Sequence, residues 1–272
     1  MTVGVLLMAY GTPRHPDEIE PYYTDIRRGR PPTPEALADL TARYAAIGGV
    51  SPLADLTEAQ RDRLQQALET VRPGHFRVAI GLKHADPKVE AAAADLAADG
   101  VDQIVGLVLA PHYSSYSIGQ YLSRAADGVA EADRSTPVVG IESWATEPAF
   151  VEFIADDLDT RLAAMRGRVD GGVRVVFTAH SLPQRIIDAG DPYPDELRST
   201  AEAVAARLDL REGADWSIGW QSAGRTPEPW IGPDVLAVID ELGDDPDVAG
   251  VVVSAVGFVA DHLEVLYDLD IE

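Results

Sequence analysis

The sequence predicts an α/β protein with two doubly wound domains, in which helices flank parallel four-stranded sheets. The first observation is that apolar runs of strand length alternate with helical stretches along the whole chain, as in βαβ units. The second is that this alternation begins again after the polar, aromatic stretch PHYSSYS at residues 111–117. The third is that no low-complexity linker separates the halves. We therefore expect two Rossmann-like domains, at residues 1–112 and 113–272.

The first half contains apolar runs that are typical of buried strands, each closed by turn residues such as Gly11-Thr12-Pro13. We expect strands at residues 3–10, 76–82 and 104–110. Thr33-Pro34 is typical of a helix start, and Thr57-Glu58-Ala59-Gln60 has the pattern of a capping box. The expected helices therefore cover residues 16–26, 34–47, 57–72 and 86–100.

The second half repeats the alternation of helices and strands. Apolar runs predict strands at residues 137–141, 173–178, 216–219 and 251–258. Helical periodicity and start signals predict helices at residues 118–130, 147–165, 194–208 and 234–242. No residue-level repeat links the two halves, so their similarity is one of architecture.

The composition excludes several classes of protein. A formal net charge of −23 repels nucleic acid and anionic membranes, so we expect neither as a partner. The chain has no cysteine, which excludes disulfides, thiolate-bound zinc and cysteine-held iron–sulfur clusters. It contains neither of the glycine-rich nucleotide-phosphate motifs. Because the N-terminus lacks a signal peptide and no apolar run could span a membrane, we expect a cytoplasmic protein.

The last stretch, residues 251–272, is expected to begin as a strand and continue as a helix with Asp261 at its start. Glu264, Asp268 and Glu272 then recur every fourth residue, which would place three carboxylates on one helical face. No Lys or Arg lies among them in the sequence. A row of hard oxygen ligands along one helical face suggests a path for a cation. The alternative is a solvated acidic face, which is common in so acidic a chain.

His180 follows an apolar strand and precedes Ser181-Leu182-Pro183, so it should lie at the carboxyl edge of a parallel sheet, where active sites form. A neutral imidazole there could ligate a metal or act as a base. The alternative is a hydrogen-bonded structural histidine. A Ser–His hydrolase using Ser181 is disfavoured, because adjacent residues on an extended turn point apart and no G-x-S-x-G motif is present.

Other candidates are weaker on sequence grounds. Tyr10 ends the first strand, and a cluster of arginines at residues 27–30 could bind a carboxylate-bearing ligand or pair with the abundant acidic residues. Three further histidines are treated as supporting or structural: His84, His112 and His262, the last expected to point away from Glu264.

Motifs throughout the chain resemble those of the ferrochelatases. They are LLMAYGTP, YYTDIRRGR, RYAAIGGVSPL, GLKHADP, LAPHYSSYS, AHSLP, GDPYPDEL, GWQSAGRTPEPWIGPDV and VGFVADHLEVLYD. The resemblance implies a chelatase-type fold of two domains and a lyase that inserts Fe²⁺ into a porphyrin. The IRRGR stretch and Tyr10 are most similar to the Gram-positive and actinobacterial branch. This similarity implies coproporphyrin III as the substrate and Fe-coproporphyrin (coproheme), an intermediate of haem biosynthesis, as the product.

The resemblance also implies roles for particular residues. His180 and Glu264 would be the catalytic pair and inner metal ligands on opposite sides of the metal path, with Asp268 and Glu272 relaying the hydrated cation. Tyr10 would approach the porphyrin face opposite His180 and could ligate iron in the product. The other positions that match family contacts to the macrocycle or its propionates are Arg27, Arg43, Tyr44, Ser51 and Tyr121. Imidazole suits iron, and either catalytic residue could accept the pyrrole protons.

Two departures from the family accompany the resemblance. Family members continue for a few dozen residues beyond the position of Glu272, so the C-terminal family segment is expected to be absent here. Some actinobacterial relatives hold a [2Fe–2S] cluster through cysteines, which this sequence lacks. We expect no cofactor, with Fe²⁺ as a substrate.

Several alternatives remain open at this level. The enzyme could act on protoporphyrin IX, although the arginine cluster modestly favours coproporphyrin, which carries more carboxylates. The protein could instead be a non-catalytic porphyrin or haem carrier, or a chelatase for cobalt or nickel. For partners, we expect a monomer that makes only transient contact with other enzymes of the haem pathway.

Overall fold

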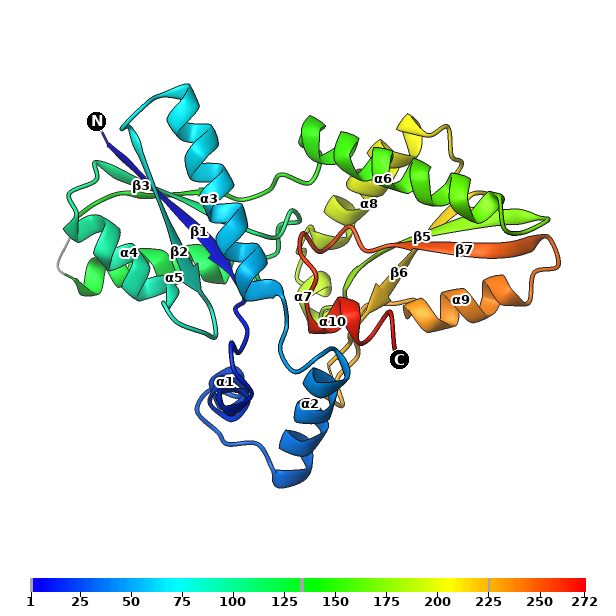
Figure 1. Ribbon diagram of the computed structural model, residues 1–272, viewed down its shortest axis with the longest axis horizontal. Coiled ribbons are helices and arrows are strands. Elements are labelled where there is room, and N and C mark those ends of the chain that lie inside the picture. Colours follow the sequence, from blue (N-terminus) through cyan, green and yellow to red (C-terminus); the bar gives the residue numbers. More distant parts are fainter. Residues whose placement is uncertain (1, 133–134, 225) are drawn as a thin grey trace. The chain divides into compact units, whose positions relative to one another are not determined.

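The computed structural model describes residues 2–132, 135–224 and 226–272 (Figure 1). The chain divides into two compact units. Unit 1 comprises residues 1–110, 117–142 and 260–272, and unit 2 comprises residues 111–116 and 143–259. This division differs from a single boundary at residue 112, because the chain crosses between the units more than once. Residues 117–142 and the last thirteen residues, 260–272, both belong with the N-terminal unit.

Unit 1 is built on a parallel sheet with the strand order β2-β1-β3-β4. Its strands are β1 (Val3–Ala9), β2 (Phe76–Leu82), β3 (Gln103–Val108) and β4 (Val138–Ile141). Every residue of β1 is buried, which explains its unbroken apolar run, and it pairs with β2 on one side and β3 on the other. Loops that follow β1 and β2 therefore emerge side by side at the carboxyl edge.

The helices of unit 1 are η1 (Pro16–Glu18), α1 (Ile19–Ile26), α2 (Pro34–Ala46), α3 (Leu53–Val71), α4 (Val89–Ala98), α5 (Ile118–Glu131) and α10 (Leu263–Leu266). Of these helices, α3, α4 and α5 pack on this sheet. Leu64 and Leu68 of α3 pack on the β1 and β2 side chains of one face. Helices α4 and α5 pack together, and Gly128 permits this: a Cβ there would lie 2.3 Å from the carbonyl oxygen of Glu90.

Two helix starts differ from the sequence prediction. The prediction of a capping box at Thr57 was wrong, because α3 begins at Leu53 and Thr57 lies inside the helix. The Thr57 hydroxyl donates back to the Leu53 carbonyl at 2.7 Å. Helix α4 begins at Val89 rather than Asp86. The preceding backbone is extended, and the Pro87 carbonyl accepts a hydrogen bond from the Leu82 N–H at 2.7 Å.

Unit 2 has a parallel sheet with the order β6-β5-β7, so the described residues form three strands there, not the expected four. The strands are β5 (Gly172–His180), β6 (Trp216–Gln221) and β7 (Val248–Ser254). Helices α6 (Pro148–Arg166) and α8 (Tyr193–Arg207) lie on one face, and α9 (Val235–Gly243) lies on the other (Figure 1). The sequence did not predict the short helix α7 (Gln184–Asp188).

The hydrophobic core of unit 2 holds its central strand, β5, in place. Val175, Phe177 and Ala179 of β5 are fully buried against Leu158 of α6 and Leu197 of α8. Close packing of this kind fixes the end of β5, where the candidate histidine lies. None of the helices within the described ranges is long and apolar enough to cross a membrane.

Candidate functional site

His180 is the last residue of β5, at the carboxyl edge of the unit 2 sheet, as the sequence predicted. Its Nδ1 hydrogen-bonds the carbonyl oxygen of Ser181. Because a carbonyl only accepts, Nδ1 carries a proton, and in the neutral imidazole the lone pair is therefore on Nε2. The Tyr193 hydroxyl donates to the His180 carbonyl at 3.0 Å, and the Trp230 ring centroid lies 6.4 Å from the imidazole. The hydrogen bond therefore selects one tautomer of the half-buried neutral imidazole.

The backbone around His180 is tightly held. The Thr178 carbonyl accepts from the Gly257 N–H at 3.0 Å, and the Thr178 hydroxyl donates to the Gln221 side chain at 2.7 Å. The Ser181 hydroxyl donates to the Ile231 carbonyl at 2.8 Å. That bond agrees with the weak case for a serine nucleophile, because the hydroxyl is committed to the backbone.

In unit 1, Tyr10 follows β1 and is 43% exposed. Its ring lies 4.6 Å from that of His84, which follows β2. His84 Nδ1 hydrogen-bonds Asp25 at 2.7 Å, and Lys88 donates to the other carboxylate oxygen at 2.9 Å. Burial lowers the pKa of His84, and the neighbouring Lys83 and Lys88 lower it further against the pull of Asp25. The lowered pKa thus favours the neutral form of His84, beside Tyr10.

Burial raises the pKa of Asp25, but the hydrogen bonds from Lys88 and His84 outweigh it, and the pKa lies below its ordinary value. Asp25 is therefore a carboxylate that accepts the His84 proton and orients the ring.

Three predicted substrate-binding residues of unit 1 are buried: Tyr44 at 2% exposure, Tyr121 and Ser51. The Tyr44 hydroxyl lies 3.3 Å from that of Thr12. Burial raises the pKa of Tyr22, and the charges of Tyr44, Tyr10 and Glu264 add to the effect. Burial likewise raises the pKa of Tyr121, with a further contribution from Tyr10. The charges that act on these pKa values place several tyrosine hydroxyls and Glu264 of unit 1 within electrostatic range of one another. The raised pKa values keep the buried phenols protonated, so that they can donate hydrogen bonds.

The predicted arginines differ in their surroundings. Arg27 caps α1, where its Nε donates to the Arg30 carbonyl at 3.3 Å and its guanidinium lies over the Tyr23 ring. Arg43 lies instead beside the C-terminal carboxylates: its Nη1 is 3.6 Å from Asp268 Oδ1 and 4.0 Å from Glu272 Oε2. The expectation of carboxylates with no counter-charge was therefore wrong, because a residue distant in sequence supplies the charge.

The C-terminal helix is also shorter than predicted. Helix α10 covers only Leu263–Leu266, and its N-cap is His262 rather than Asp261. His262 lies in extended backbone outside the helix, so helical periodicity does not govern it. Its Nε2 lies 3.7 Å from Glu264 Oε2, whereas the sequence predicted that it would point away. Asp268 follows α10 in a turn, and Glu272 lies just after that turn. Among the residues with described positions, no group of three or more His, Asp or Glu side chains could hold a metal ion.

The units divide the predicted metal residues between them. His180 belongs to unit 2, whereas Glu264, Asp268 and Glu272 belong to unit 1, although the sequence assigned all of them to one C-terminal domain. Their roles stay predictions, as do those of the substrate-binding residues.

Sequence reasoning missed Asp25, Lys83 and Tyr193. Asp25 and Lys83 lie within motifs that carried the resemblance, YYTDIRRGR and GLKHADP, directly beside residues that were chosen. Lys83 and Lys88 are the chain's only lysines, and that scarcity was a usable signal. Tyr193 acts through a bond to a backbone carbonyl, for which the sequence carries no signal.

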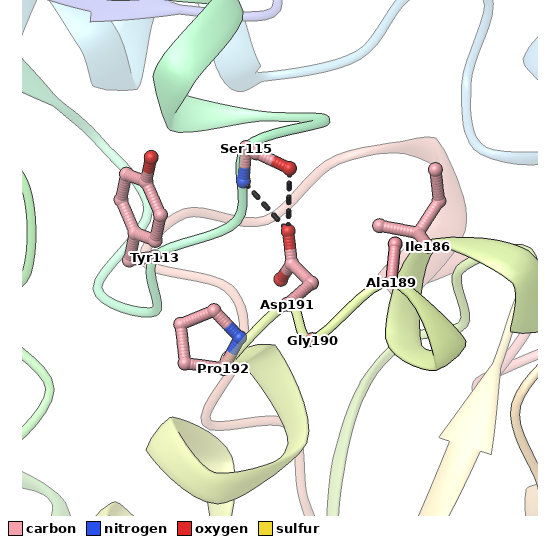
Figure 2. Close-up of a pocket in the computed structure, with 7 residues that line it drawn as sticks. All are labelled: Tyr113, Ser115, Ile186, Ala189, Gly190, Asp191 and Pro192. Carbon is pink, nitrogen blue, oxygen red and sulfur yellow. Dashed lines mark hydrogen bonds between the residues drawn. The ribbon is translucent and has the colours of Figure 1, made fainter.

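Two cavities lie apart from the predicted site residues. In unit 2, a cavity of about 290 Å³ is lined by Tyr113, Ser115, Ile186, Ala189, Gly190, Asp191 and Pro192. Figure 2 shows that the Asp191 carboxylate accepts hydrogen bonds from both the backbone N–H and the hydroxyl of Ser115. In unit 1, a cavity of about 400 Å³ runs beside β2 and is lined in part by Arg14, Arg61 and Arg77.

Comparison with known proteins places the chain in a family. A sequence model of the family described as Ferrochelatase matches residues 2–272. The chain is 47% identical over 272 residues to "Coproporphyrin III ferrochelatase" of Geobacillus kaustophilus, covering 100% of this chain and 85% of that protein. It is 45% identical over 271 residues to "Coproporphyrin III ferrochelatase 1" of Bacillus anthracis and to "Coproporphyrin III ferrochelatase" of Halalkalibacterium halodurans, covering 99% of this chain and 86% of each. The chain belongs to the ferrochelatase family.

Proposed function

We propose that this protein is a coproporphyrin III ferrochelatase, a lyase that inserts Fe²⁺ into coproporphyrin III to give coproheme in haem biosynthesis. The observation that carries the proposal is 45–47% identity, over essentially the whole chain, to proteins with that name. The reaction exchanges two pyrrole N–H protons for one Fe²⁺. It therefore needs ligands that replace the water of the ion and a base that takes the protons.

The proposed roles follow from the residue chemistry. His180 has a protonated Nδ1, so its Nε2 can take a proton or contact the metal. Glu264 supplies a hard oxygen ligand and a second proton acceptor. The substrate macrocycle is assigned to Tyr10, Arg27, Arg43, Tyr44, Ser51 and Tyr121. His84, held neutral beside Tyr10, is an additional candidate base on the unit 1 side.

The outer carboxylates take a modified role. Asp268 and Glu272 were proposed to relay hydrated Fe²⁺, and Arg43 now shares their charge. A partly neutralised pair attracts a divalent cation less strongly, which favours passage over tight binding. We propose that Glu264 is the tighter ligand and that the outer pair only guides the ion.

The remaining proposals concern cofactors and surroundings. The protein needs no resident cofactor, and the absence of cysteine leaves no thiolate for an iron–sulfur cluster. We place the reaction in the cytoplasm, in a monomer that meets other haem-pathway enzymes only transiently.

The experiment that tests this function compares porphyrins under anaerobic conditions. The protein is mixed with Fe²⁺ and either coproporphyrin III or protoporphyrin IX, and the loss of free-base absorption is followed. Faster turnover of coproporphyrin III supports the proposal, and preference for protoporphyrin IX contradicts it. Tight binding without turnover would identify a carrier. Parallel reactions with Co²⁺ and Ni²⁺ test which metal ion the protein inserts.

A further inference from the structure

Lys83 is a half-buried cation at the carboxyl edge of the unit 1 sheet. Lys83 directly follows β2. Its backbone N–H donates at 2.9 Å to the carbonyl of Ala9, the residue that precedes Tyr10. Its Nζ donates to the Gln120 side chain at 3.0 Å and lies 5.1 Å from the centroid of the Tyr121 ring. Helix α5 thus holds the ammonium beside Tyr121, a residue assigned to the substrate.

The ammonium of Lys83 lacks the acidic partner that its neighbours have. Lys88 pairs with Asp25 at 2.9 Å, and Arg124 pairs with Glu90. Within the described ranges, no carboxylate lies within ion-pair distance of Lys83 Nζ, although the chain has 45 acidic residues. The charges that act on it have its own sign: burial, Arg124 and Arg28 together lower its pKa to about 8. A desolvated cation among cations is unfavourable, so this arrangement costs stability unless an anion completes it.

We propose that Lys83 binds a carboxylate of the porphyrin substrate. An ammonium has three donors, and the bond to Gln120 uses only one of them. The Tyr121 ring contributes a cation–π contact and an apolar surface. Porphyrin substrates of this family carry propionates, and coproporphyrin carries more of them than protoporphyrin. This inference rests on the proposed function and adds to it a residue that discriminates substrates by their carboxylates.

The test compares Lys83→Met with Arg77→Met in the full-length chain. Arg77 is the matched control, because it carries the same charge within β2, the strand that Lys83 follows, but pairs with Asp99. Binding of coproporphyrin III and of protoporphyrin IX is titrated by porphyrin fluorescence, and the melting temperature is measured without ligand. Loss of a charge-assisted hydrogen bond predicts about tenfold weaker coproporphyrin binding in Lys83→Met and no change in Arg77→Met.

The melting temperature separates binding from a structural role. Because none of the carboxylates in the described ranges pairs with Lys83, Lys83→Met is expected to melt at or above the wild-type temperature while it binds coproporphyrin more weakly. Lys83→Arg keeps the charge and is expected to retain most of the affinity. If Lys83→Met misfolds, Lys83→Gln, which keeps a polar contact for Gln120, is expected to show the same loss of affinity.

Equal coproporphyrin affinity in the wild type, Lys83→Met and Lys83→Gln would overturn this inference and leave the proposed function intact. So would a loss of affinity in Lys83→Met that is matched in Arg77→Met. Failure of the wild-type protein to bind or metalate coproporphyrin III would instead overturn the proposed function.

Discussion

Arg43 Nη1 lies 3.6 Å from Asp268 Oδ1, and both side chains are 18% exposed. The same guanidinium lies over the Tyr267 ring, 5.0 Å from its centroid. Helix α2 thus supplies a cation to the C-terminal carboxylates of unit 1. In the proposed substrate-binding role of Arg43, a porphyrin propionate would compete with Asp268 for this guanidinium.

The Arg43–Asp268 pair is expected to stabilise unit 1. Replacing Arg43 with Met leaves a partly buried carboxylate without its cation, so we expect a loss of about 1–2 kcal/mol in the free energy of unfolding. A double-mutant cycle with Asp268→Asn is expected to give a coupling energy of about 1 kcal/mol, measured by urea unfolding.

The exposed pair of Arg161 and Asp157 serves as the control for that cycle, because its side chains are 63% and 52% exposed. Its coupling energy is expected to stay below about 0.5 kcal/mol. Equal coupling in both cycles would contradict the stabilising role assigned to Arg43.

Gly257 is expected to be required for the position of His180. A Cβ at residue 257 would lie 2.4 Å from Ala179 Cβ and 2.7 Å from Ala179 Cα, so Gly257→Ala must displace the strand next to His180. We expect a stability loss of about 1–3 kcal/mol and lower turnover. The control is Gly243→Ala, where the added Cβ meets nothing within 4 Å. Wild-type stability and turnover in Gly257→Ala would show that β5 tolerates the shift.

His112 is expected to make unit 2 sensitive to acid. Its Nε2 bonds the Thr200 hydroxyl at 2.8 Å, and burial lowers its pKa to about 3. The unfolded chain binds a proton near pH 6.5 while the folded chain does not, so stability is complete above about pH 6.5 and is lost as the pH falls toward 3. The loss should reach about 2 kcal/mol at pH 5, as measured by urea unfolding.

His112→Gln isolates that contribution. The variant loses some stability at neutral pH with the altered Thr200 contact, but its stability should fall less steeply between pH 6.5 and 5. Parallel pH profiles for the two proteins would exclude His112 as the cause.

The acidic surface predicts salt-dependent stability. With a net charge of −23, self-repulsion destabilises the folded state, and screening relieves it. We expect the melting temperature to rise between about 0.01 and 1 M salt, over which the screening length falls from about 30 to 3 Å. A melting temperature that does not change with salt would contradict this expectation.

The existence of the strands could be predicted from the sequence, because most of them contain a short apolar run between turn signals. Residues 76–82 were predicted without error, and the strand predicted at residues 173–178 lies within β5, which extends to His180. The last strand was predicted too late, at residues 251–258, whereas β7 covers Val248–Ser254. Helix starts were less accurate, since Thr57 can bond the carbonyl of Leu53 within a helix as readily as it can cap one. The division into units escaped prediction because the chain crosses between them several times.

The candidate site was predictable only where a residue type carries its own chemistry. His180 ends β5 and Tyr10 directly follows β1, and both positions at a strand end are visible in the sequence. The partners of charged side chains are not visible, because tertiary contacts decide them. Arg43 neutralises Asp268 across 225 positions, and Asp25 orients His84 across 59. Among the residues that the structure describes, the same contacts leave no carboxylate paired with Lys83, which no local pattern indicates.

The most direct test of the account is anaerobic insertion of Fe²⁺ into coproporphyrin III by the wild type, His180→Ala and Glu264→Gln. The exposed residues His15 and Glu202 provide matched controls, His15→Ala and Glu202→Gln. We predict that the wild type and controls turn over, while both site variants bind the porphyrin but metalate it at least about 100-fold more slowly. Wild-type rates in His180→Ala and Glu264→Gln would contradict the account.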